Sequence, residues 1–160
     1  GTIALNLAAR HAWNPQVVGV VAMAAPVRLI DHRYRAAELK GLLRRWRDWG
    51  RPDIKDRAQW EKHIGYKLAP LSSTIQLIRL VHETCDLLPE VRQPLLVIQS
   101  QQDHTVPAIN VHWLLDRVGS IDRQVLWLED SHHVITVDVE AEKVARRVLE
   151  FTRHLQASPQ

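Results

Sequence analysis

The hydrophobic positions along this 160-residue chain follow two different periods, which predict two kinds of element. Short apolar runs without polar alternation are typical of parallel strands that are buried on both faces. Three such strands are predicted, at Val17–Ala25, Pro94–Gln99 and Gln124–Leu128. Apolar residues at helical spacing predict three helices around them, at Thr2–Trp13, Ala108–Val118 and Val139–Leu155. Strands that alternate with helices predict an α/β protein with a parallel sheet and right-handed crossovers.

Between the first and second predicted strands the pattern is helical throughout. Amphipathic helices are predicted at Leu39–Trp49, Ile54–Leu68 and Ser72–Leu88. An insertion of this length interrupts the alternation of strands and helices, so we interpret it as a lid or cap over the strand ends. The predicted division is a core of residues 1–26, a helical cap of residues 27–93, and a second core part of residues 94–160.

Two predicted loops carry an acid and two histidines at the carboxyl ends of neighbouring strands. Asp103 follows the strand Pro94–Gln99, and His132 and His133 follow the strand Gln124–Leu128. Consecutive parallel strands joined by one helix pair at about 4.8 Å, and ligands of such sheets bind beyond their carboxyl ends. A buried carboxylate fixes the tautomer of an imidazole and stabilises its protonated form, which predicts a catalytic acid–base pair. From position alone, the alternative is a surface ion pair or a capping arrangement.

The residues around this pair resemble those of α/β-hydrolases, most closely the bacterial carboxylesterases and monoacylglycerol lipases. The segment Leu95–Pro107 resembles their acid loop, and Ser131–Asp138 resembles the Ser-x-His-Val-Ile-Thr-x-Asp run that carries their catalytic histidine. Gly1–Leu5 resembles the start of the helix after the nucleophile elbow, and Val20–Pro26 resembles the strand leading into the cap. The resemblance covers nearly the whole chain. It implies a partial α/β-hydrolase fold with a helical cap, and hydrolysis of carboxylic esters by a Ser-Asp-His triad.

The resemblance implies that Asp103 is the catalytic acid and His133 the catalytic base. The family run usually has a small residue before the histidine, whereas this chain has His132 at that position. The Val-Ile-Thr sequence after His133 sets the register of the match. His133 is therefore the favoured base, and His132 is the alternative.

The triad nucleophile is not found in the sequence, because no Gly-x-Ser-x-Gly turn occurs in it. In this fold the serine precedes the acid and the histidine, and the resemblance at Gly1–Leu5 implies that it lies just upstream of Gly1. The oxyanion-hole donors come from the residue after the serine and from an earlier loop. We therefore expect the chain to be the C-terminal part of a hydrolase, inactive by itself, with a hydrophobic sheet edge at Val17–Ala25.

Composition places the chain among ordinary globular proteins. It is 46% hydrophobic and 24% charged, has a net charge of +3, and contains one cysteine, Cys85, so no internal disulfide can form. The longest apolar run, Val17–Pro26, is shorter than the about 20 residues that span a bilayer, and no signal peptide is visible. The histidines show no His-x-x-x-His or Cys-paired spacing. We predict a cytoplasmic protein without a metal or a cofactor.

The segment Arg28–Arg57 is basic, with ten Lys or Arg residues against five Asp or Glu residues. One interpretation is weak attraction to an anionic lipid surface or an acidic substrate, and the favoured one is a solvated face of the cap helices. Trp46, Trp49 and Trp60 either pack the cap or line an acyl pocket. The predicted partner is a small ester such as an acylglycerol, with no nucleic acid. The alternative function is a non-catalytic hydrolase-fold or nucleic-acid-binding protein that uses the Arg28–Arg57 surface.

Overall fold

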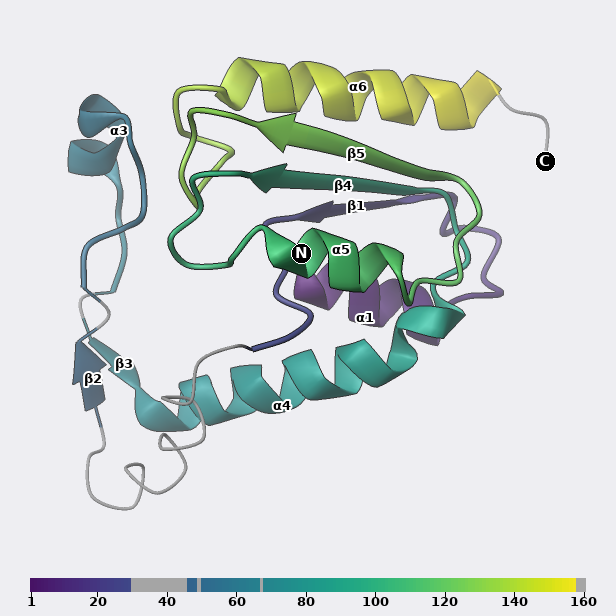
Figure 1. The fold of residues 1–160 in the computed structure, drawn as a ribbon, viewed down its shortest axis with the longest axis horizontal. Coiled ribbons are helices and arrows are strands. Elements are labelled where there is room, and N and C mark those ends of the chain that lie inside the picture. The colour runs from purple at the N-terminus through teal and green to yellow at the C-terminus, as the bar shows by residue number, and fades with distance from the viewer. Residues whose placement is uncertain (30–45, 49, 67, 158–160) are drawn as a thin grey trace.

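A three-stranded parallel sheet forms the centre of the molecule (Figure 1). The structure is a computed structural model that describes residues 1–29, 46–48, 50–66 and 68–157. The strands are β1 (Val20–Met23), β4 (Leu95–Ser100) and β5 (Arg123–Leu128), in the spatial order β1-β4-β5. Both pairings are parallel, so the carboxyl ends of the strands meet at one edge of the sheet. The three strands predicted from the apolar runs are thereby confirmed.

Helices cover both faces of the sheet (Figure 1). The face packed by α1 (Thr2–Arg10) and α5 (Ile109–Leu115) also receives the 3₁₀ turn η1 (Leu88–Glu90), and the other face packs against α6 (Ala141–Ala157). All six residues of the central strand β4 are buried. Leu95 and Val97 face α1 and α5, whereas Leu96 and Ile98 face α6. Burial on both faces explains why the sequence of this strand is apolar without alternation.

The helix α4 (Leu71–Leu87) runs alongside α1 beneath the sheet (Figure 1). The Asn6 Nδ2 group donates a hydrogen bond of 3.1 Å to Thr84 Oγ1 between the two helices, and both side chains are buried. Val81 of α4 is fully buried as well. The C-terminal half of α4 therefore packs on the core helix α1. The division into core and cap at residues 26/27 and 93/94 stays a prediction.

The described part of the chain between β1 and α4 contains a short helix and a pair of strands. The helix α3 (Arg57–Lys62) begins after Asp56, whose carboxylate accepts hydrogen bonds from the N–H groups of Ala58 and Gln59. The strands β2 (Trp46–Asp48) and β3 (Leu68–Pro70) pair antiparallel. Figure 1 shows this segment on the side of the sheet toward which the strand arrows point.

The helix predicted at Leu39–Trp49 is wrong at residues 46–48, which form a strand. Helical spacing is a local property, and here pairing with a strand about 20 positions away determines the backbone. The rest of that predicted helix, and the basic residues between 30 and 45, lie outside the described residues. The helix predicted at Ile54–Leu68 is reduced to α3.

Within the described residues, no helix combines the length and the apolar character needed to cross a membrane. The cytoplasmic location stays a prediction.

Candidate active site

The loops after β4 and β5 place Asp103 and His133 side by side. Ser100 at the end of β4 pairs with Leu128 at the end of β5, so both chains leave the sheet at the same level. The Ser100 hydroxyl then donates to the Ser131 carbonyl, which joins the two loops. With the loops joined, the His133 Nδ1 atom lies 2.9 Å from Asp103 Oδ2. The structure thus brings together the acid and the favoured histidine of the sequence analysis.

The carboxylate of Asp103 is buried and fully hydrogen-bonded. Its Oδ1 atom accepts from the backbone N–H groups of Thr105 at 2.9 Å and Val106 at 2.7 Å. Its Oδ2 atom accepts from Gln99 Nε2 at 2.8 Å in addition to the contact with His133. Burial alone would raise the pKa of Asp103, but the hydrogen bonds of His133, Val106 and Thr105 and the charge of His133 hold it below the usual value. The group is therefore an anion at neutral pH that faces the imidazole.

His133 is oriented by this carboxylate. Because an ionised carboxylate only accepts hydrogen bonds, the proton of the neutral imidazole resides on Nδ1 and the Nε2 atom carries the lone pair. The side chain keeps 29% of its surface exposed, whereas that of Asp103 has none. An imidazole held in this tautomer and partly exposed to solvent can take up a proton at Nε2.

Asp138 fixes the loop that carries His133. It is 3% exposed, and its carboxylate accepts hydrogen bonds from four backbone N–H groups, those of Lys55, Asp56, His132 and Val139. The shortest, from His132, measures 2.7 Å. Burial acts to raise the pKa of Asp138, and these four donors outweigh it and lower the pKa. The sequence analysis did not assign this clamp, although Asp138 closes the run that resembles the histidine segment.

Glu140 holds the beginning of the same loop. Its carboxylate accepts from the N–H groups of Asp130 at 2.9 Å and Ser131 at 3.0 Å, and from the Ser131 hydroxyl. Burial acts to raise the pKa of Glu140, but the N–H of Asp130, the Lys143 ammonium, and the N–H groups of Ser131 and Glu129 lower it to about 2. Asp138 and Glu140, which directly precede α6, therefore anchor the histidine loop to the start of that helix.

The second histidine, His132, has a different partner. Its Nδ1 atom lies 3.2 Å from Asp53 Oδ1, and Asp53 belongs to the segment before α3. The same carboxylate oxygen lies 2.9 Å from His104 Nδ1. The structure therefore places His133, and not His132, on Asp103. Sequence reasoning missed Asp53, because nothing in its local sequence distinguishes it from other acids of the segment.

Two serines close to the pair are interior groups. Ser100 and Ser131 are both fully buried, and their hydroxyls donate to the Ser131 carbonyl and to Glu140, respectively. They connect the loops rather than face the imidazole.

Gly1 lies against the carboxyl end of β1, at the same edge of the sheet as the two loops. A Cβ atom at Gly1 would lie 2.4 Å from the Met23 carbonyl oxygen and 2.5 Å from Ala25 Cβ, closer than any side chain can approach. Gly1 is also the N-cap residue of α1. Only glycine fits at this contact between a strand end and a helix start.

Three cations of the basic segment have partners within the molecule. Arg28 stacks on the ring of Trp113 at 4.8 Å, and Arg51 stacks on that of Trp60 at 5.4 Å. Lys55 pairs with Asp130 at 3.1 Å. These contacts favour packing within the molecule over a free binding surface, and no observation on the described residues supports the nucleic-acid alternative. Association with lipid surfaces stays a prediction, since most of the segment lies outside the described residues.

Comparisons with known proteins identify relatives of the chain. No family model matches the chain. It is 32% identical over 153 residues to the thermostable monoacylglycerol lipase of Bacillus sp. (strain H-257), covering 94% of this chain and 58% of that protein. It is 26% identical over 144 residues to a carboxylesterase of Bacillus subtilis (strain 168), covering 89% and 57%. One solved structure, from work on the metagenome-derived lipolytic enzymes LipS and LipT, shares 28% identity at a TM-score of 0.84, covering 94% and 61%. The chain therefore spans about three-fifths of the length of these relatives.

A parallel sheet between helical layers, with the acid and the histidine on loops at its carboxyl edge, has the architecture of an α/β-hydrolase. Its homologues are a monoacylglycerol lipase and a carboxylesterase, and its fold matches that of a solved lipolytic enzyme.

Proposed function

We propose that the protein carrying this chain is a serine hydrolase of carboxylic esters, of the carboxylesterase or monoacylglycerol lipase type. Asp103 and His133 are then the acid and the base of its Ser-Asp-His triad. The observation that carries the proposal is the 2.9 Å contact between His133 Nδ1 and the buried Asp103 carboxylate at the carboxyl ends of adjacent strands. The names of the homologues support an ester substrate, with small acylglycerols as the first candidates.

In this mechanism His133 transfers protons and Asp103 stabilises the charge that results. The His133 Nε2 atom removes the proton of the serine hydroxyl as the serine oxygen attacks the ester carbonyl. The Nδ1–H of the imidazolium donates a hydrogen bond to Asp103, which stays ionised because its hydrogen bonds lower its pKa. The Nε2 proton then passes to the departing alkoxide. Water, deprotonated by the same nitrogen, hydrolyses the acyl-enzyme and regenerates the serine.

We place the nucleophile and the oxyanion-hole donors in residues that precede Gly1. The close packing of Gly1 on the end of β1 fits the last glycine of a nucleophile elbow, and the homologues are longer than this chain. The 160-residue chain by itself is then expected to hydrolyse no ester above background. Turnover of a p-nitrophenyl ester by the pure chain, abolished by Asp103→Ala, would contradict this part of the proposal.

Replacement of each histidine by alanine in the intact protein tests the assignment of the base. His133→Ala is expected to lower kcat for a p-nitrophenyl ester and for a monoacylglycerol by roughly 10⁴-fold or more, because the members of a triad act as a unit. His132→Ala is the matched control, since its ring contacts Asp53 and not Asp103, and it should keep most of the activity. The proposal fails if His132→Ala abolishes turnover while His133→Ala preserves it.

A further inference from the structure

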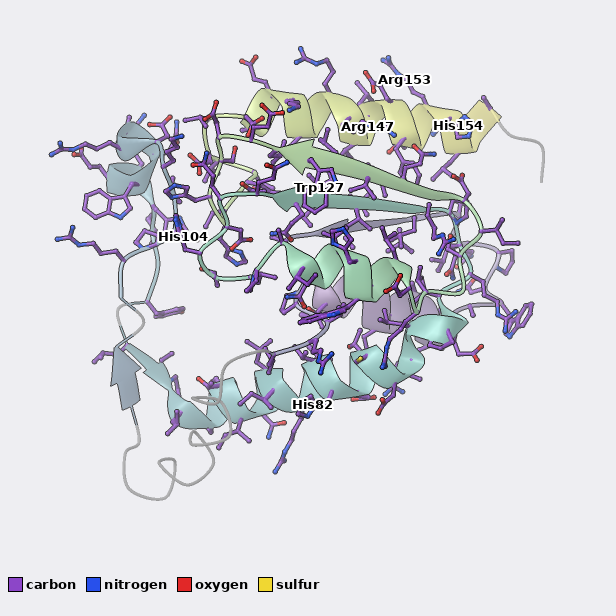
Figure 2. The ribbon with its side chains drawn as sticks, viewed as in Figure 1. His82, His104, Trp127, Arg147, Arg153 and His154 are labelled. Atoms are coloured by element: carbon purple, nitrogen blue, oxygen red, sulfur yellow. The ribbon has the colours of Figure 1, made fainter. Side chains whose placement is uncertain are left out.

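Three metal-ligating side chains from separate segments converge beside the Asp103–His133 pair. Asp53 comes from the segment before α3, His104 follows Asp103, and His132 precedes His133. The Asp53 Oδ1 atom lies 2.9 Å from His104 Nδ1 and 3.2 Å from His132 Nδ1. Figure 2 shows His104 on the side of the sheet that faces the α3 segment.

The Asp53 carboxylate is held in place by groups other than the two imidazoles. Its Oδ2 atom accepts hydrogen bonds from the backbone N–H of His104 at 3.0 Å and from the Thr105 hydroxyl at 3.2 Å. The Asp53 carbonyl oxygen also accepts from the Val134 N–H at 3.2 Å. The backbone N–H of His132 is fixed by Asp138. One carboxylate oxygen is thereby directed at two imidazoles whose backbones are themselves anchored.

We propose that Asp53, His104 and His132 form a binding site for a divalent transition-metal ion of the zinc type. One ligand atom from each residue lies within 4.8 Å of the other two. Bonds of about 2.0–2.1 Å in a tetrahedral site put ligand atoms about 3.4 Å apart, which is close to the two measured oxygen–nitrogen distances. The ring planes of His104 and His132 meet at 87° with centroids 4.5 Å apart, so the rings do not stack face to face and block the space between them.

The donor set selects the class of ion. Two imidazole nitrogens and one carboxylate oxygen suit zinc and its neighbours in the first transition row, whereas magnesium and calcium prefer oxygen ligands alone. The His104 side chain is 67% exposed, so the ion has access from solvent and a fourth position for water. The proposal does not depend on ester hydrolysis, because none of these three side chains belongs to the proposed triad.

An ion at this site would connect three segments of the chain. It would join the segment before α3 to the loop of Asp103 through His104, and to the loop of His133 through His132. The alternative is that Asp53 serves only as a hydrogen-bond acceptor for the two rings and binds no ion. The two cases differ in whether added metal stabilises the folded protein.

Thermal unfolding of the intact protein with and without added ZnCl₂ tests the site, together with the number of zinc ions bound after equilibrium dialysis. At a free Zn²⁺ concentration about 100-fold above Kd, the unfolding midpoint should rise by roughly 5 °C or more, with one ion bound per chain. His104→Ala and Asp53→Asn should remove both effects. His82→Ala is the matched control, since His82 is an exposed histidine on α4, away from this group (Figure 2), and it should keep both.

The same experiment can overturn the site. An absence of a zinc-dependent rise in the wild-type protein contradicts it, as does a rise of equal size in His104→Ala, which would place the ion elsewhere. His104→Ala is the decisive variant because its exposed side chain can be removed without disturbing the core. An equal rise with MgCl₂ would exclude the transition-metal class.

Discussion

Gln99 shows how a single buried residue supports the candidate site. It is 1% exposed, and its Nε2 group donates to Asp103 Oδ2 at 2.8 Å and to the Val106 carbonyl at 3.1 Å. Gln99→Leu removes the donor and leaves both acceptors buried. We expect the free energy of unfolding of the intact protein to fall by about 1–3 kcal/mol in urea denaturation.

The matched control for this substitution is Gln76→Leu, which makes the same chemical change at an exposed position of α4. It should alter the free energy of unfolding by less than about 0.5 kcal/mol. If Gln99→Leu is as stable as Gln76→Leu, the amide does not contribute to holding the acid.

Glu140 makes part of the stability of the molecule dependent on pH. Its pKa in the folded protein is about 2, against an ordinary value of 4.5, because the N–H groups of the histidine loop and Lys143 favour its anion. A lowered folded pKa stabilises the protein above the ordinary pKa, and this stabilisation is lost as the pH falls through the folded value. In thermal unfolding of the intact protein, the midpoint of Glu140→Gln should therefore lie below that of the wild type at pH 7. The difference between the two midpoints should disappear between about pH 4.5 and pH 2. A gap of constant size over this range would show that the charge of Glu140 is not responsible.

The contact between Asp103 and His133 could be predicted from the sequence, whereas the position of Asp53 beside it could not. Asp103 and His133 follow consecutive parallel strands, and the parallel pairing of those strands is enough to predict that their loops meet. Asp53 lies 51 positions before His104 and 79 before His132, and no regular element links it to either loop. Its place depends on how the segment before α3 folds back over the strand ends, which local patterns do not encode.

At the scale of elements, Asp138 joins three parts of the fold. It lies three residues before α6, and it binds the backbone of the histidine loop at His132 and of the α3 segment at Lys55 and Asp56. Asp138→Ala leaves these buried N–H groups without their acceptor. We expect the free energy of unfolding to fall by about 3 kcal/mol or more, and the His132 amide to exchange its hydrogen faster.

Asp130→Asn provides the comparison for Asp138→Ala. Asp130 is an exposed acid of the same loop, and its side chain pairs with the Lys55 ammonium at the surface. Its substitution should change the free energy of unfolding by no more than about 1 kcal/mol. Unchanged protection of the His132 amide in Asp138→Ala would show that the loop is held by other contacts.

The strands of the central sheet were predicted more accurately than the segment between β1 and α4, which was predicted to be a helical cap. Burial on both faces gives β4 an apolar sequence without polar alternation, and this pattern located the strand. The strand β2 is short and depends on β3 for its hydrogen bonds, so its own sequence carries no sign of pairing. The prediction of a helix across residues 46–48 failed for this reason.

At the scale of the whole molecule, the β1 edge of the described sheet is unpaired. Among the described residues, β1 pairs with β4 on one side and with no strand on the other. An apolar hollow beside this edge is lined by residues of α1 and of the start of β1, including Leu7, Val17 and Val20. Leu7, which lines this hollow, and Val18, two residues before β1, are exposed. An unpaired strand edge next to an exposed apolar patch is a site of association between chains.

The 160-residue chain alone is therefore expected to self-associate in sedimentation velocity experiments, in a manner that depends on its concentration. Val18→Lys should reduce the association, because a charge beside the open edge of β1 opposes contact with a second strand. Leu149→Lys is the matched control, since Leu149 has the same exposed fraction, 49% against 48%, but lies on α6, the helix covering the other face of the sheet. If the two variants associate equally, the contact does not involve the β1 edge. If the unmodified chain stays monomeric at all concentrations, the β1 edge does not mediate association.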